Sequence, residues 1–66
     1  MIRLASVAVP VPQLDLLTYR VPDGIETPAA GARVLVPMGT RTITGCVIGT
    51  VVVPDDDPRA TADRLR

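Results

Sequence analysis

The sequence predicts a small all-β domain, namely a partly open antiparallel β-barrel of the OB or SH3-like kind with about four strands and a short C-terminal helix. Val, Ile and Thr occupy 21 of the 66 positions, and such β-branched residues favour strands. Seven Pro and five Gly interrupt the chain at short intervals, as expected for short strands joined by turns. With 47% hydrophobic residues, the chain can build a core, but its length suffices for one domain only.

The first two strands are expected at residues 3–11 and 18–22. In the first, the apolar residues at odd positions share one face. Pro10 and Pro12 cannot donate ladder hydrogen bonds, so this strand should end, or lie at an edge, from there onward. The second strand runs into Pro22-Asp23-Gly24, which has the composition of a tight turn.

A loop over 25–32 leads to a short third strand at 33–37, which ends in the turn 38–41. The longest strand is expected over Thr42–Val53. Gly45 and Gly49 are expected to lie on the same face as the apolar positions 43, 47 and 51. Glycines in a strand permit the sharp coiling that a small barrel needs, so we interpret both as bend points.

The acidic run 55–57 ends the barrel. Asp57 as N-cap and Pro58 at the first helical position predict a short helix through Leu65. The domain organisation is therefore a barrel at 1–54 and an acidic linker with a short helix at 55–66. Because four strands leave open sheet edges, we expect the barrel to lack a last strand that follows Arg66, or to pair with a copy of itself.

Composition limits the possible functions. The chain has seven Arg, no Lys, seven acidic residues and a net charge of zero, whereas domains that track many phosphates are usually basic. Without His, and with a single Cys at position 46, imidazole catalysis, an internal disulfide and a thiolate metal site are all excluded. No uninterrupted apolar run exceeds six residues, which is far short of a membrane helix. No catalytic residue and no metal ligand is expected.

Three groups of residues could have either a chemical function or a purely structural role. Asp15, Asp23 and Glu26 are either an acid–base set or solvated turn residues, and the second interpretation is favoured. The run 55–57 either binds a hard cation or is a linker and helix cap, again with the second favoured. Cys46 is either a reactive thiol or a buried inert one, and no basic neighbour in sequence supports reactivity.

Four segments form an ordered pattern: VAVPVP (7–12), TYRVPDG (18–24), GARVLVPMG (31–39) and GCVIGTV (45–51). In this order and spacing they resemble the extreme N-terminus of the replication-restart helicase PriA (primosomal protein N′). The resemblance implies a small β-barrel that recognises the 3′ terminus of a DNA strand, such as the nascent leading strand at a stalled fork. It implies that ATP hydrolysis, zinc binding and unwinding belong to other parts of the parent helicase, with no cofactor in this chain.

The resemblance also places the DNA pocket. It lies at Leu17 and Thr18 beside Tyr19, at Gly39, and at Arg66. The family has Phe and Asp where this chain has Leu17 and Thr18. A carboxylate accepts a hydrogen bond from the 3′-hydroxyl and repels a 3′-phosphate, whereas a threonine hydroxyl carries no charge. We therefore expect up to about tenfold weaker end recognition here, unless Asp15 compensates.

Two candidate site residues have open alternatives. Tyr19 either stacks on a base or lies in the core with its hydroxyl tethered, and the core is favoured because Val21 shares its face. Arg41 is either a solvated turn residue or a phosphate contact.

Two functions remain in competition. The first is a 3′-end-binding module of a primosomal helicase, and the second is a non-catalytic barrel that docks proteins or packs between domains. For the first, the resemblance implies as partners DNA with a 3′ terminus, the remainder of the helicase, and also primosome proteins and single-stranded-DNA-binding protein. It implies a bacterial cytoplasmic location at the nucleoid and no membrane association.

Overall fold

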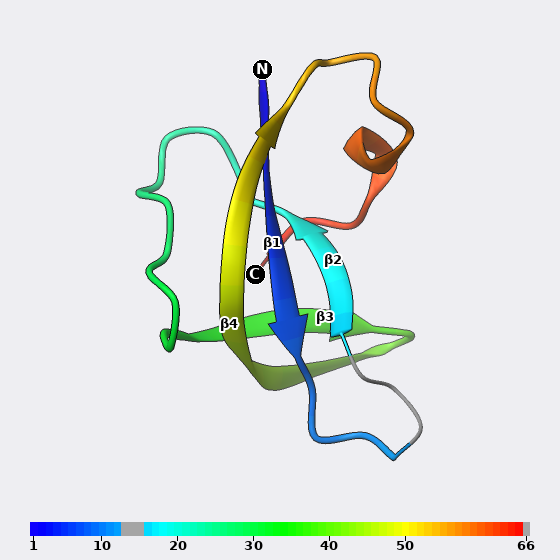
Figure 1. The fold of residues 1–66 in the computed structure, drawn as a ribbon. Helices are drawn as coiled ribbons and strands as arrows, with labels where there is room; N and C mark the ends of the chain where they lie inside the picture. The colour runs from blue at the N-terminus through cyan, green and yellow to red at the C-terminus, as the bar shows by residue number, and fades with distance from the viewer. Residues whose placement is uncertain (13–15, 66) are drawn as a thin grey trace.

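Four antiparallel strands form one strongly coiled sheet in the computed structural model, which describes residues 1–12 and 16–65 (Figure 1). The strands are β1 (Ile2–Ala8), β2 (Leu16–Arg20), β3 (Arg33–Met38) and β4 (Arg41–Val53), and their order in the sheet is β2-β1-β4-β3. The expected small, partly open all-β fold is confirmed. Strand β1 is an interior strand of the sheet, because it pairs with both β2 and β4.

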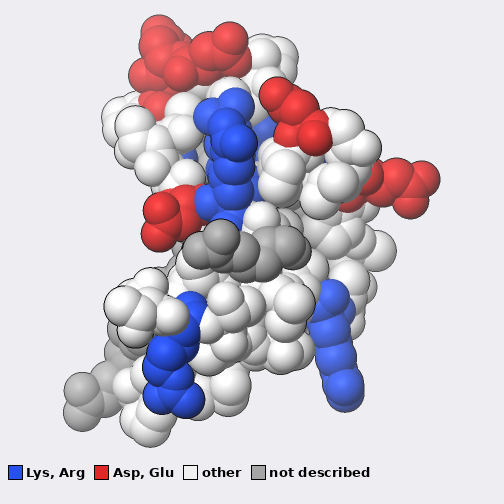
Figure 2. All heavy atoms as spheres, turned by 180° about the vertical axis from the view of Figure 1, so that it is seen from behind, with Lys and Arg blue, Asp and Glu red and all other residues white. Residues whose placement is uncertain are grey.

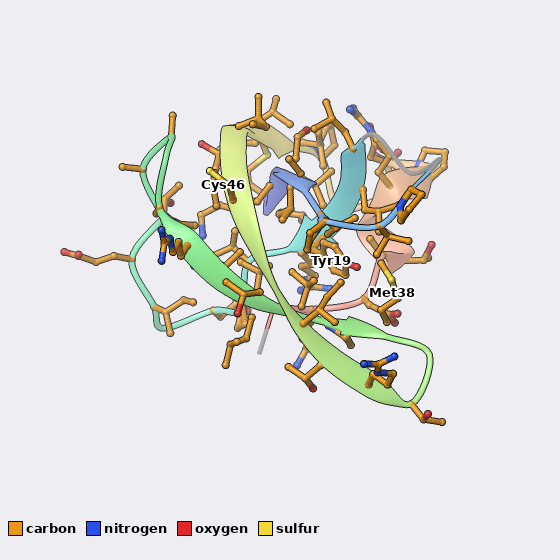
Figure 3. All side chains as sticks on the ribbon, turned by 90° about the horizontal axis from the view of Figure 1, so that it is seen from below. Tyr19, Met38 and Cys46 are labelled. Carbon is orange, nitrogen blue, oxygen red and sulfur yellow. The ribbon has the colours of Figure 1, made fainter. Side chains whose placement is uncertain are left out.

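The concave face of the sheet holds the main core. Alternation works as the sequence predicts for β1, where Ala5 and Val7 point inward and are fully buried. Their partners come from the other strands and are at most 5% exposed: Tyr19, Val36 and Val47. Figure 3 shows Tyr19 inside the barrel with Met38 nearby, and Met38 packs against this core.

Tyr19 ties together the two ends of the sheet. Its ring is buried in the core, and its hydroxyl donates a hydrogen bond of 3.0 Å to the carbonyl oxygen of Pro37. Tyr19 belongs to β2 and Pro37 to β3, which are the two outermost strands of the sheet. This side-chain bond therefore helps to close the barrel where no backbone ladder joins those strands.

Removing only this hydroxyl, by Tyr19→Phe, is expected to lower the free energy of unfolding by about 1 kcal/mol, because one part-buried hydrogen bond is lost while the ring remains. For a domain of this size the melting temperature should fall by about 4–8 °C. Thermal unfolding followed by circular dichroism measures the change. An unchanged melting temperature would show that the bond does not help to close the barrel.

A β-bulge divides β4 into two halves. Ser6 lies opposite Gly49 and Val7 lies opposite Val47, so Ile48 is an extra residue without a partner in β1. The bulge places Gly49 and Val51 on the outer face of the sheet, away from Val47. The expectation that these positions share the inner face was therefore wrong, because it assumed a regular strand.

At Gly45, β4 leaves no room for a side chain against β1. A Cβ atom built at Gly45 would lie 3.0 Å from the carbonyl oxygen of Ala8 and would also meet the side chain of Val7. At Gly49, by contrast, an added Cβ meets nothing within 4 Å. Only the first of the two glycines is thus required by packing in the barrel.

The chain after β4 crosses the outer face of the sheet. A 3₁₀ helix, η1 (Pro58–Thr61), packs Ala60 against a second small core of Ile2, Leu4 and Val53. Asp57 caps this helix as expected, since its carboxylate accepts a hydrogen bond of 2.8 Å from the backbone N–H of Arg59. The expected continuation of the helix to Leu65 was wrong, because the helix ends at Thr61 and Ala62 is extended.

Residues 63–65 instead add a short parallel bridge at the free edge of β2. The backbone N–H of Arg20 donates to the carbonyl of Asp63 at 2.8 Å, and that of Leu65 donates to the carbonyl of Arg20 at 3.0 Å. Leu65 is 6% exposed and joins the main core. A helix of barely two turns is marginal in water, so burial of Leu65 decides the local conformation.

The loop between β2 and β3 is fastened to β1 by Arg3. Its guanidinium donates hydrogen bonds of 2.7 Å to the carbonyls of Pro22 and Ile25 and one of 3.0 Å to the hydroxyl of Thr27.

Within the described residues, no helix is long and apolar enough to span a membrane.

Candidate nucleic-acid interface

A polar hollow of about 510 Å³ lies between the β3–β4 turn and the extended segment 63–65. Its lining residues are Pro37 and Gly39 on one side and Asp63, Arg64 and Leu65 on the other. The two sides belong to parts of the chain that are more than twenty residues apart. The hollow therefore exists only because the C-terminal segment folds back along β2.

Backbone conformation, hydrogen bonds and core packing together hold both walls of the hollow in place. On the first side, Gly39 has φ +62, a left-handed conformation that L side chains rarely adopt, and the carbonyl of Pro37 is held by the hydroxyl of Tyr19. On the second side, two backbone hydrogen bonds to Arg20 and the burial of Leu65 fix the segment. The hollow is thus preorganised by the core.

The charges at the hollow are of opposite sign. Asp63 and Arg64 are neighbours in sequence, both are exposed, and both line it. Burial raises the pKa of the Tyr19 hydroxyl above its usual value, and the negative charge of Asp63 raises this pKa further. The carboxylate of Asp63 therefore acts on the hydroxyl that holds Pro37 on the opposite wall.

The charges elsewhere do not form a continuous basic track. Figure 2 shows one face of the domain, on which a short column of basic side chains is bordered by acidic ones, while two further basic side chains stand apart below. A long nucleic-acid groove would require clustered positive charge. On this face, the described residues are arranged for a few local contacts instead.

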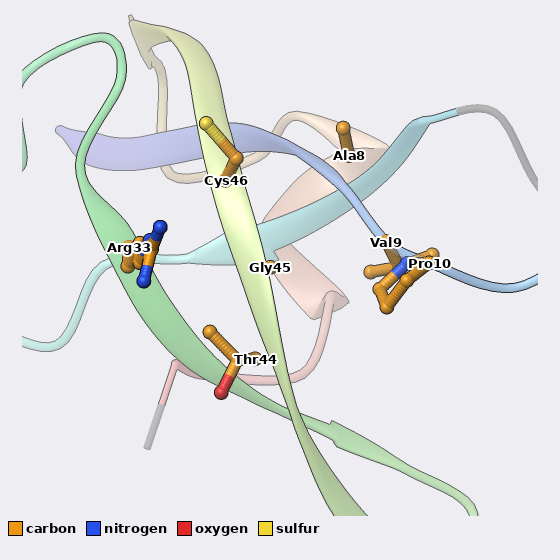
Figure 4. A pocket seen from close by; sticks show the side chains of 7 residues that line it. All are labelled: Ala8, Val9, Pro10, Arg33, Thr44, Gly45 and Cys46. Atoms are coloured by element: carbon orange, nitrogen blue, oxygen red, sulfur yellow. The ribbon is translucent and has the colours of Figure 1, made fainter.

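A second, mainly apolar hollow of about 400 Å³ opens on the outer face of the sheet (Figure 4). Its lining residues are Ala8, Val9, Pro10, Arg33, Thr44, Gly45 and Cys46. Cys46 lines this hollow and is half-buried, so its thiol is not fully buried, in contrast to the expectation from the sequence. Arg33 is the only charged side chain among these lining residues.

The sequence model of the 3′-DNA-binding domain of PriA matches residues 6–65. The chain belongs to this family. No curated protein and no solved structure matched the chain. As a PriA 3′-DNA-binding domain, it is a DNA-binding module rather than a catalytic one.

The structure brings together one part of the pocket that the resemblance to PriA predicts. Gly39 lines the polar hollow, directly opposite the segment that ends at Leu65. Arg66 lies outside the described residues, as does Asp15. The two preceding residues of the C-terminal segment, Asp63 and Arg64, do line the hollow.

The other predicted residues of this PriA domain lie elsewhere. Leu17 is half-buried and packs against the main core, and Tyr19 is buried, as its core alternative predicted. Thr18 is exposed on the outer face of β2, opposite Ser6. Arg41 lines a separate hollow beside Pro10, Val11, Met38 and Ile43.

Asp63 and Arg64 line the hollow but are not among the site residues that the sequence predicts. Both were placed in a helix, where nothing marked them as neighbours of Gly39. The usable signal was Leu65, which is the only large apolar residue after Val53. Its burial in the core positions its two polar neighbours at the rim.

The acidic run is engaged within the domain. The N-terminal ammonium of Met1 lies 2.6 Å from the Asp55 carboxylate, and its hydrogen bond holds the pKa of Asp55 below the usual value. Hydrogen bonds from Arg59 likewise hold the pKa of the Asp57 carboxyl below its usual value. These contacts agree with the linker-and-cap interpretation of residues 55–57.

Proposed function

We propose that this domain binds the terminal nucleotide of a DNA strand with a free 3′-hydroxyl in the polar hollow between Gly39 and residues 63–65. The observation that supports the proposal is the position of Gly39, which belongs to the family's expected pocket and, alone among the pocket residues that the structure describes, lines a preformed polar hollow. A glycine gives a ligand close access to the backbone, because no Cβ intervenes. Arg64 supplies a cation for one phosphate.

The biological setting that we propose is one that membership of this family supports. The domain serves a bacterial replication-restart helicase by holding the nascent leading strand at stalled or branched forks near the nucleoid. ATP hydrolysis and zinc binding belong to the remainder of that helicase. Primosome proteins and single-stranded-DNA-binding protein are its further proposed partners.

A titration with labelled single strands tests the proposal. Three strands of one sequence carry a free 3′-hydroxyl, a 3′-phosphate, or a bulky label that blocks the 3′ end. We expect the free end to bind best. Because one or two phosphates are contacted, the logarithm of the affinity should fall with the logarithm of salt concentration with a slope of about −1.

Arg64→Ala should weaken binding and flatten this slope, while Arg33→Ala serves as the matched control because Arg33 lies at the apolar hollow on the outer face. Equal affinity of the wild-type domain for all three strands would contradict end recognition. No binding to any strand would favour the alternative of a barrel that docks proteins, for which the apolar hollow beside Cys46 is the candidate surface.

A further inference from the structure

A carboxylate is present in the polar hollow although the position that the family uses for one carries threonine. Thr18 lies on the outer face of β2, whereas Asp63 lines the hollow together with Gly39. We infer that Asp63 is the specificity residue that distinguishes a free 3′-hydroxyl from a 3′-phosphate in this domain. This inference rests on the proposed function.

The chemistry of a carboxylate suits this role. An ionised carboxylate only accepts hydrogen bonds, so it pairs with the 3′-hydroxyl, which can donate. Its negative charge opposes a phosphate at the same position, and this repulsion excludes both a 3′-phosphate and a strand that continues. Within residues 1–12 and 16–65, the Asp63 carboxylate forms no salt bridge, so its charge is not neutralised by these residues.

Arg64 provides the complementary contact. A terminal nucleotide carries a hydroxyl at its 3′ side and a phosphate at its 5′ side, and the hollow offers an acceptor and a cation from adjacent residues. A nucleotide placed with its 3′-hydroxyl at Asp63 can direct its 5′ phosphate toward Arg64. The opposite orientation would bring the phosphate to the carboxylate, so the pair also selects the polarity of the strand.

The position of Asp63 is fixed by the backbone. Its carbonyl accepts the hydrogen bond from Arg20, and Leu65, two residues later, is anchored in the core. The effect of its charge on the pKa of Tyr19 agrees with a carboxylate close to the opposite wall, where the Tyr19 hydroxyl holds Pro37. A carboxylate on an anchored backbone needs less ordering on binding than one on a mobile loop.

The test compares Asp63→Asn with wild type, using the 66-residue chain and fluorescently labelled strands that end in a 3′-hydroxyl or a 3′-phosphate. Asparagine has nearly the same shape and still accepts a hydrogen bond, but it does not repel phosphate. We expect the ratio of the two affinities to fall by about tenfold, toward one, because a charged hydrogen bond is replaced by a neutral one and the repulsion is lost. Binding of the 3′-phosphate strand should become tighter.

Asp56→Asn is the matched control. Asp56 is exposed in the acidic run and does not line the hollow, and its replacement changes the net charge by the same amount. Its affinity ratio should equal that of wild type. Thermal unfolding of both variants confirms that the fold is kept.

The two proposals fail in different ways. If the wild-type domain does not prefer a 3′-hydroxyl strand over a blocked one, the proposed function itself is overturned. If the wild type prefers it and Asp63→Asn keeps the full preference for hydroxyl over phosphate, only the role of Asp63 is overturned. In that case Thr18→Asp should be tested next. A gain in selectivity for the 3′-hydroxyl in this variant would assign recognition of the strand end to β2.

Discussion

Gly39→Asn is expected to weaken binding of a free 3′ strand end by more than about tenfold while the fold is retained. Gly39 lines the polar hollow, and a Cβ added to it meets no atom within 4 Å, so the new side chain would enter open space. That space is where we propose the terminal nucleotide lies. Asparagine is chosen because it tolerates the φ of +62 better than other residues with side chains.

Gly24→Asn is the control for this experiment. Gly24 also has a positive φ, of +88, and open space around an added Cβ, but it lies in the turn after β2 and does not line the hollow. Fluorescence anisotropy with a 3′-hydroxyl strand measures binding, and circular dichroism melting checks the fold. Wild-type affinity of a folded Gly39→Asn variant would contradict the placement of the DNA end.

Gly45→Ala is expected to lower the free energy of unfolding by about 1–3 kcal/mol, because overpacking a core costs this much. The added Cβ would approach the Ala8 carbonyl oxygen to 3.0 Å and collide with Val7, which is fully buried. The backbone of β4 cannot easily move away from β1, since β4 is paired with β1 on one side and with β3 on the other. The melting temperature should fall by about 4–8 °C for each kcal/mol.

Gly49→Ala makes the same chemical change in the same strand and is the matched control. Nothing lies within 4 Å of its added Cβ, so we expect the melting temperature to remain at or slightly above that of wild type. Urea unfolding of both variants gives the two free energies. Equal stability of the two variants would show that the barrel accommodates a Cβ at position 45 without cost.

The strands were predictable because residue type and periodicity agreed. In β1, alternation correctly placed Ala5 and Val7 on the inner face, and the turn residues around Gly24 and Gly39 marked the chain reversals. Both glycines have a positive φ, a backbone conformation that favours glycine and explains why it marks these turns in the sequence.

The bulge in β4 could not be predicted in the same way. Around Ile48 the strand contains apolar residues on both sides, so the pattern is compatible with either register. The actual register depends on pairing with Ser6 and Val7, which are about forty residues away in sequence. Local periodicity contains no information on such a contact.

The candidate site was predictable only through the β3–β4 turn. Gly39 was named from the resemblance and lies in the hollow, whereas Asp63 and Arg64 were assigned to a helix. Capping residues at Asp57 and Pro58 correctly indicated where that helix begins. Its end depends on whether Leu65 reaches the core, which is a tertiary effect and decides which side chains line the hollow.

The sheet order has a consequence for biosynthesis. β1 is synthesised first and becomes an interior strand, but its pairing with β4 requires the chain up to Val53, and Leu65 adds to the core later still. A nascent chain that has emerged only as far as β3 exposes one edge of β1 and half of a barrel interior. Folding during translation therefore cannot be completed before β4 has been synthesised, and until then one edge of the valine-rich strand β1 stays unpaired.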